Sequence, residues 1–248
     1  TDGSLPSLVD EGEIRGDLHT HTNWSDGDNT IAEMVAAAAE RGYDFHVVSD
    51  HATGPGMVGG VGVDDEELLE QIDEVRAVAS DADITVFTGV EANIDAEGGL
   101  SVADDVLDQL DVVVASPHSA LDQDRETATD RLVRAMEHPA VDVLGHPTGR
   151  LINQRPGLPL DYERLAEAAV ENSVALELNA SPYRLDLNGE ALKIAVEAGA
   201  TIAIDTDAHR PAELDHARYG VHTARRGWVE TADVLNTWSL DDLTDFLH

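Results

Sequence analysis

Short apolar segments alternate with segments of helical periodicity from Ile14 to about residue 206. In the stretch 64–79, Leu68, Ile72 and Val75 fall on one stripe of a helix whose first turn is acidic. The apolar segments are short and rich in valine and isoleucine, which is typical of strands. The predicted strands cover 14–19, 44–49, 84–91, 111–116, 141–145, 174–179 and 201–206. The predicted helices cover 31–41, 64–79, 124–137, 161–172 and 188–198, with short helices at 231–237 and 240–247.

Strands that alternate with helices indicate a parallel sheet. Because the strands are almost continuously apolar, we expect both faces of the sheet to be covered. Polar residues with metal-binding chemistry follow many of these strands. A closed barrel presents side chains at all its strand ends, whereas an open doubly wound sheet gathers ligands at one switch point. The pattern therefore favours an α/β fold of the TIM-like (β/α) barrel type, with the site at the C-terminal strand ends.

Two segments lack this regular pattern. Residues 1–13 are polar and aperiodic and are expected to be a linker or arm, which leaves 14–248 as the barrel domain. The glycine-rich stretch 54–62 lies directly after His51. It is interpreted as a mobile loop over the site, with a plain flexible turn as the alternative.

Composition narrows the class of protein. The chain has 248 residues, of which 42% are apolar, so it can bury a substantial core. It contains no cysteine, which excludes disulfides, thiolate ligands and a cysteine nucleophile. There is no apolar run of the roughly 20 residues that span a bilayer. Without a recognisable leader, the expected location is cytoplasmic and no membrane partner is expected.

The charge is strongly negative, because 50 acidic residues face 15 basic ones for a net charge of −35. An ordinary acidic surface is one interpretation. We favour adaptation to molar salt, where self-repulsion is screened within about 3 Å. This charge disfavours long-range attraction of DNA but leaves a DNA substrate open, because counterion release matters little in molar salt.

Histidines and acids gather at the ends of the predicted strands. His19 and His21 alternate along one strand end and therefore point to the same side. A closed barrel would place them beside Asp207 and His209, which follow the last strand. Imidazole and carboxylate are ligands of divalent metals, and Glu91 has two oxygens with which to bridge them. The candidate ligands are His19, His21, Asp26, His51, Glu91, His118, His146, Asp207 and His209. The structural alternatives are a buried ion pair for Glu91 and packed core histidines for His118 and His146.

The motifs DLHTHT (17–22), SDH (49–51), SPHS (116–119), GHP (145–147) and DTDAH (205–209), together with Glu91, resemble the PHP (polymerase and histidinol phosphatase) superfamily. The segments GHPTGR (145–150), NASPYRLDL (179–187) and ARRGW (224–228) are similar to the C-terminal PHP domain of prokaryotic family X DNA polymerases. The resemblance runs from about Ile14 to the end. Asn93, where relatives often have an acid, and Pro117 depart from the pattern without removing a ligand.

The resemblance implies a distorted (β/α)7 barrel and up to three divalent metals, with manganese or zinc favoured and iron also admissible. It assigns the first metal to His19, His21, Glu91 and Asp207; the second to Glu91, His118 and His146; and the third to Asp26, His51 and His209. Glu91, His118 and Asp207 are the residues expected to be catalytic.

A cluster of this kind suits hydrolysis by a metal-activated water. The resemblance implies a DNA 3′→5′ exonuclease or 3′-end-processing phosphodiesterase, with an upstream polymerase domain in a longer protein as a partner. The alternatives are a phosphomonoesterase for a small metabolite, such as histidinol phosphate or a nucleotide, and a non-catalytic structural module. Arg150, Arg184 and Arg225 are candidate phosphate clamps, and Tyr183 is a candidate for stacking on a base. Pairing with surface acids and core packing are their respective structural alternatives.

Overall fold

The computed structural model describes residues 6–56 and 61–247, and in this part of the chain seven parallel strands pair in sequence order. The strands are β1 (Gly16–Asp17), β2 (Phe45–Val48), β3 (Thr85–Asn93), β4 (Val112–Ser116), β5 (Val143–Leu144), β6 (Ala175–Asn179) and β7 (Ile202–Asp205). Each predicted strand is present, and the expected (β/α)7 TIM-like fold is confirmed. Residues 57–60 of the glycine-rich stretch and residues 1–5 of the predicted arm lie outside the described residues.

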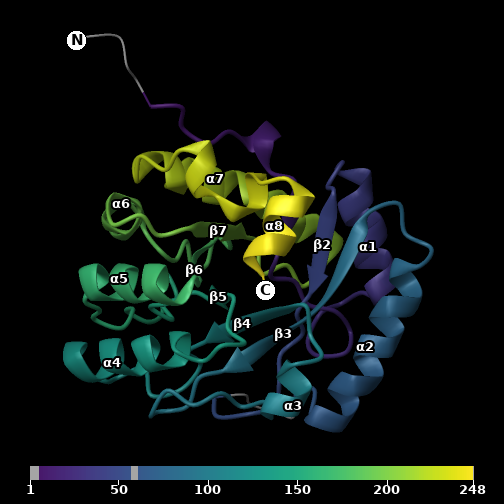
Figure 1. The fold of residues 1–248 in the computed structure, drawn as a ribbon, viewed down its shortest axis with the longest axis horizontal. Helices are drawn as coiled ribbons and strands as arrows, with labels where there is room; N and C mark the ends of the chain where they lie inside the picture. The colour runs from purple at the N-terminus through teal and green to yellow at the C-terminus, as the bar shows by residue number, and fades with distance from the viewer. Residues whose placement is uncertain (1–5, 57–60, 248) are drawn as a thin grey trace.

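Helices lie between and around the strands, with α4, α5 and α6 on one side of the molecule and α1 and α2 on the other (Figure 1). The helices are α1 (Ile31–Glu40), α2 (Asp65–Ala79), α3 (Asp104–Leu107), α4 (Arg125–Met136), α5 (Tyr162–Asn172), α6 (Gly189–Glu197), α7 (Ala217–Arg226) and α8 (Leu240–Phe246). Capping boxes start α1 at Thr30 and α2 at Asp64. The sequence pattern missed α3, which has only four residues, and gave no bounds for α7, which continues directly from a 3-10 helix (η2, Pro211–His216).

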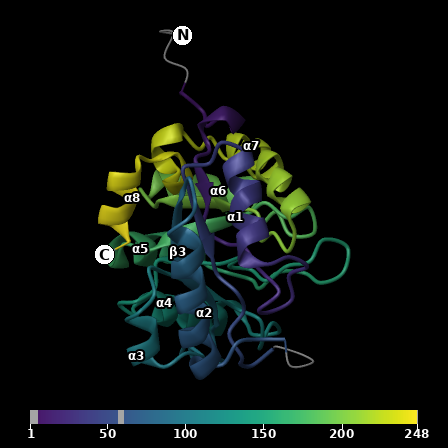
Figure 2. The ribbon, with the colours of Figure 1, turned by 90° about the vertical axis from the view of Figure 1, so that its right-hand side faces the viewer.

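The apolar core has two main parts. Val, Leu and Ala side chains between the sheet and the surrounding helices form one. The other fills the barrel interior, where Phe45, Val47 and Val114 pack with Leu243 and Leu247 of the C-terminal segment. Figure 2 shows α8 at the left edge of the molecule, with α1 and α2 toward the viewer. Apolar side chains fill this part of the barrel interior. Polar side chains that could bind a ligand are therefore expected at the C-terminal ends of the strands.

Polar groups close the seam between β1 and β7. The Thr206 backbone N–H and hydroxyl both donate to Asp17, and the Leu18 N–H donates to Asp205 Oδ1 at 2.8 Å. Asn236 donates to Asp205 Oδ1 at 2.9 Å and to the Gly16 carbonyl at 3.1 Å. Beyond the C-terminal ends of these two strands, the His21 N–H donates to the Ala208 carbonyl at 2.8 Å. The first and last strands are therefore neighbours, and the two histidine motifs that follow them lie side by side, as expected for a closed barrel.

The described part of the N-terminal segment, residues 6–13, is not a loose arm. Val9 is fully buried in the core, and its N–H donates to the Val229 carbonyl at 3.2 Å. A 3-10 helix (η1, Glu11–Glu13) follows, capped by Asp10. A single apolar residue in a polar stretch gives no periodic signal, so the sequence did not reveal this anchor. No helix in the described ranges is long and apolar enough to cross a membrane.

Asp142 gives the fold a testable pH dependence. Burial raises the pKa of its carboxyl to about 7, although the group accepts a hydrogen bond from the Val113 N–H at 2.8 Å. The folded state therefore binds more protons than the unfolded state between pH 4 and 7, so this carboxyl lowers stability as the pH rises through that range. We expect Asp142→Asn to raise the free energy of unfolding by about 2 kcal/mol at pH 8.

Chemical denaturation of variant and parent at several pH values measures this difference. The gain should shrink as the pH falls toward 4, and the exposed control Asp122→Asn should show no such pH dependence. A gain that is equal at pH 5 and pH 8 would contradict a buried, proton-binding Asp142.

Candidate metal centre

Glu91, fully buried near the C-terminal end of β3, lies among five imidazoles. Its two oxygens divide these rings into two groups. Oε1 lies 2.8 Å from His146 Nε2 and 3.2 Å from His118 Nε2. Oε2 lies 2.5 Å from His51 Nδ1, 3.3 Å from His19 Nε2 and 3.7 Å from His21 Nε2. One carboxylate thus faces the ring nitrogens of histidines that follow four other strands.

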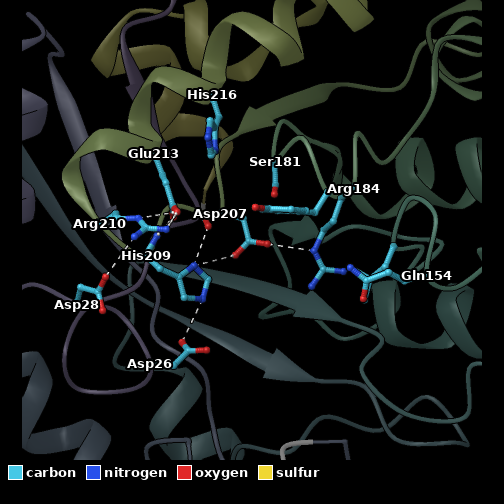
Figure 3. A pocket seen from close by; sticks show the side chains of 12 residues that line it. Asp26, Asp28, Gln154, Ser181, Arg184, Asp207, His209, Arg210, Glu213 and His216 are labelled. Atoms are coloured by element: carbon cyan, nitrogen blue, oxygen red, sulfur yellow. Dashed lines mark hydrogen bonds and ion pairs between the residues drawn. The ribbon is translucent and has the colours of Figure 1, made fainter.

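A second group of ligands surrounds Asp207 and Asp26 (Figure 3). Asp207 Oδ1 lies 3.0 Å from His21 Nε2, and the Asp207 main-chain carbonyl accepts a hydrogen bond from His209 Nδ1 at 2.9 Å. Asp26 Oδ1 lies 3.1 Å from His209 Nε2 and 3.6 Å from His51 Nε2. All nine residues singled out in the sequence are therefore brought together in one cluster.

The hydrogen bonds of two rings identify which nitrogens are free to bind a cation. Asn93 donates through Nδ2 to the Ala52 carbonyl, so its Oδ1, 2.7 Å from His118 Nδ1, must accept a hydrogen bond from that ring. In a neutral ring His118 Nε2 then carries a lone pair, and it faces the Glu91 oxygen. His19 has the same arrangement, with Nδ1 2.6 Å from Glu177 Oε1 and Nε2 toward Glu91.

The inner ring nitrogens and the Glu91 oxygens are both acceptors and face each other, so several of these buried atoms have no hydrogen-bond partner. Such atoms are costly unless something satisfies them. The orphaned atoms here include His19 Nε2, His51 Nδ1, His118 Nε2 and Glu91 Oε2. A divalent cation between imidazole and carboxylate acceptors would satisfy them all, so the residues fit a metal centre.

Charge states in the cluster agree with this chemistry. Burial, together with neighbouring rings, lowers the pKa of His21 to about 3, and burial with the charge of Arg184 lowers that of His146 to about 3. Burial alone would raise the pKa of Glu91 and Asp207, but the surrounding histidines hold both well below their usual range. At neutral pH His21 and His146 are therefore neutral and both carboxylates are ionised, which are the forms that bind metals. Burial would also lower the pKa of His19, His51 and His209, but the neighbouring carboxylates raise it, to about 9 for His209, so a cation that binds these rings must displace protons.

Proximity groups the ligands into three overlapping sets: His19, His21 and Asp207; His51, Glu91 and His118; and His21, Asp26, His51 and His209. These sets resemble the three expected metal positions. They differ in placing His51 beside both Glu91 and Asp26, and His21 in two sets. His146 joins the Glu91 side through its 2.8 Å contact.

Two buried residues that the sequence interpretation missed support the ligands. Glu177 on β6 binds the His19 ring through one oxygen and accepts the His146 backbone N–H with the other. His146 has φ +22° and Asp207 has φ +54°, so both ligands sit in the left-handed region and need such anchors. Asn179 steadies Asp207 by donating to its Oδ2 at 3.0 Å. The signal was available, because an acid inside the apolar strand at 174–179 is unusual.

A pocket of about 510 Å³ opens beside the cluster, and Figure 3 shows Arg184 reaching from its wall to Asp207. Arg184 Nε lies 3.2 Å from Asp207 Oδ2, and Tyr183 at the rim is 63% exposed. Arg210, which the sequence interpretation did not single out, also lines the pocket and pairs with Glu213 at 2.7 Å. His216, which the sequence interpretation did not single out either, lines it as well.

Two of the predicted phosphate clamps lie elsewhere. Arg150 donates to the carbonyls of Arg184 and Leu185, so it supports the loop that carries Arg184. Arg225, near the end of α7, donates to the Val9 carbonyl at 2.8 Å. An arginine that satisfies backbone carbonyls cannot be told from a phosphate ligand by residue type alone, and the phosphate-binding role of both residues stays a prediction.

Comparison with known proteins agrees with this geometry. The family model described as PHP domain matches residues 17–181. The DNA polymerase/3'-5' exonuclease PolX of Bacillus subtilis (strain 168) is 42% identical over 241 residues, which cover 97% of this chain. The chain spans 42% of the length of that relative. A protein named probable phosphatase from Caldanaerobacter subterraneus subsp. tengcongensis is 34% identical over 205 residues, covering 78% of this chain and 75% of that protein.

A solved structure shares the fold at low sequence identity. The histidinol phosphate phosphatase of Lactococcus lactis subsp. lactis, crystallised with zinc, L-histidinol and phosphate, aligns with a TM-score of 0.59 and 17% identity. The alignment covers 85% of this chain and 94% of that one.

Proposed function

Because this chain belongs to the PHP domain family of metal-dependent phosphoesterases, we propose that it hydrolyses phosphodiester bonds at the 3′ ends of DNA. The activity proposed is a 3′→5′ exonuclease or 3′-end-processing enzyme. The observation that carries the hydrolytic part is Glu91, a buried carboxylate in contact with five imidazoles. The choice of DNA rests on the 42% identity to the Bacillus subtilis exonuclease.

We assign the ligands to three positions. His19, His21, Glu91 and Asp207 would hold the first divalent ion; Glu91, His118 and His146 the second; and Asp26, His51 and His209 the third. When bound, such ions lower the pKa of a water molecule and stabilise charge on the phosphate. Imidazole with carboxylate admits manganese, zinc or iron.

The side chains around the cluster would orient the substrate. Arg184 is half-buried at the pocket wall, with its charge beside Asp207, and can hold a phosphate oxygen. Tyr183 projects at the rim and offers an exposed ring for a terminal base. Arg150 acts indirectly, because it fixes the carbonyls of the loop that presents both residues.

Arg184 can be separated from the metal ligands by kinetics. We expect Arg184→Ala to lower kcat/KM by about 10- to 100-fold, mainly through KM, because a charge-assisted hydrogen bond to phosphate is lost. Metal content should not fall, since no assigned ligand is removed. Steady-state kinetics with metal analysis checks both, and Arg164→Ala, an exposed arginine paired with Asp130, is the matched control. Kinetics equal to those of the control would return Arg184 to a structural role.

A small phosphomonoester is the second candidate substrate. The pocket volume of about 510 Å³ suits a single nucleotide or metabolite, and several relatives are named probable phosphatases. The deciding experiment incubates 5′-labelled single-stranded DNA, or histidinol phosphate and nucleotides, with the protein in molar KCl containing manganese or zinc. A ladder shortened from the 3′ end supports the exonuclease, and release of phosphate from the small esters alone would replace it.

A polymerase domain on the N-terminal side of this chain is proposed as a partner in a longer protein, by analogy with the Bacillus subtilis relative. Such a neighbour would deliver 3′ ends to the centre. The assignment of a non-catalytic structural module fits less well, because the side chains of all nine expected ligands lie in one cluster.

A further inference from the structure

Two ligand rings that face Glu91 have different partners on their outer sides. His19 Nδ1 lies 2.6 Å from a Glu177 carboxylate oxygen, and His118 Nδ1 lies 2.7 Å from the Asn93 amide oxygen. Both contacts are short and both partners are fully buried. The two rings therefore differ mainly in whether their outer partner can carry a negative charge.

An outer carboxylate makes an imidazole a stronger metal ligand. It stabilises the partial positive charge that spreads over the ring when the inner nitrogen binds a cation. A neutral amide fixes the ring orientation equally well but supplies much less of this electrostatic support. Asn93 cannot change its role, because its Nδ2 donates to the Ala52 carbonyl at 2.7 Å and lies 3.3 Å from Ser101 Oγ.

The other ligands do not offset this difference. His21 on the first side and His146 on the second each have a buried Nδ1 without a hydrogen-bond partner. Solvent access adds to the contrast, because the His19 side chain is fully buried and that of His118 is 12% exposed. Exchange of an ion with solvent requires such access.

We propose that the ion held by His118 and His146 is exchangeable, whereas the ion held by His19 and His21 is retained, and that Asn93 and Glu177 set this difference. Asn93 and Glu177 are positioning residues, since each acts through a ligand ring. The inference rests on the ligand assignment proposed above. The proposal predicts that the occupancy of the site at His118 and His146 depends on the free metal concentration.

Metal retention tests the proposal without any substrate. The full chain is loaded with Mn²⁺ in molar KCl and dialysed against rising EDTA concentrations, and the bound manganese is counted by mass spectrometry. We expect the parent protein to lose the ion held by His118 and His146 in an earlier step than the ion held by His19 and His21. The third assigned ion, beside the more exposed Asp26 and His209, adds a step that neither variant below moves. Asn93→Ala should move only the His118 step, by about 10- to 100-fold in EDTA concentration. Glu177→Gln should move mainly the His19 step, with a smaller effect on the other, because Glu177 also holds the His146 backbone.

Asn172→Ala is the matched control, because this exposed asparagine also donates to a backbone carbonyl, that of Ala168, but lies on α5 away from the ligands. Its release profile should match the parent. The parent profile needs no variant, so the test survives if Glu177→Gln does not fold. Release in a single step, or an equal effect of Asn93→Ala on the His118 and His19 steps, would overturn this inference and leave the ligand assignment standing. Failure of the parent to bind manganese, zinc or iron at all would overturn the proposed function as well.

Discussion

Replacing Glu91 with alanine is expected to abolish phosphoester hydrolysis and to release at least one metal ion. The five rings around its carboxylate would then face one another without the anion that they share. Two of the three proposed metal positions use this side chain, so the loss should exceed the roughly 10²- to 10³-fold that follows removal of a single electrostatic contact.

Turnover, bound metal and circular dichroism together check this expectation. The fold should persist, because Glu91 contacts ligand rings while the apolar core beneath it is built by other side chains. Glu91→Gln keeps the size of the side chain but not its charge, and should also lose metal. Glu97→Ala, an exposed acid in the loop after β3, is the control. A Glu91→Ala protein with full activity and metal content would remove the bridging role.

The fold and the ligand cluster could be predicted because both depend on repeating patterns. Each strand reads as a short apolar run, and in a parallel barrel the residue after each run must lie at the same end. That rule alone brings Glu91 on β3 next to His146 after β5, although 55 positions separate them. The apolar pattern did not predict the lone anchor Val9 or the four-residue helix α3.

The groups around the ligands could not be predicted in the same way. Glu177 and Asn93 matter because of which ring nitrogen each one meets, and this depends on side-chain directions across different strands. Arg150 and Arg225 share a residue type with Arg184, yet backbone carbonyls engage the first two. Only the tertiary structure tells which arginine keeps its guanidinium beside the pocket.

The second large effect expected is a steep dependence of stability on salt. A net charge of −35 creates repulsion across the surface that lasts over about 10 Å at 0.1 M salt and is screened within about 3 Å at 1 M. Raising KCl from 0.1 to 2 M should therefore raise Tm by at least about 10 °C, since 1 kcal/mol corresponds to about 2–4 °C in a chain of this size. Calorimetry in KCl, and in sucrose of equal osmolality, measures it.

The sucrose series separates screening from the general stabilisation that excluded solutes produce. On α2, Glu66, Glu70 and Glu74 are exposed and follow one another at intervals of four, so like charges repel along one helix face. Glu70→Gln removes both repulsions and should stabilise the protein by several tenths of a kcal/mol at 0.1 M KCl, but hardly at all at 2 M. An equal gain at both salt concentrations, or an equal rise of Tm in sucrose and KCl, would mean that packing or hydration, and not charge repulsion, determines how this acidic surface responds to salt.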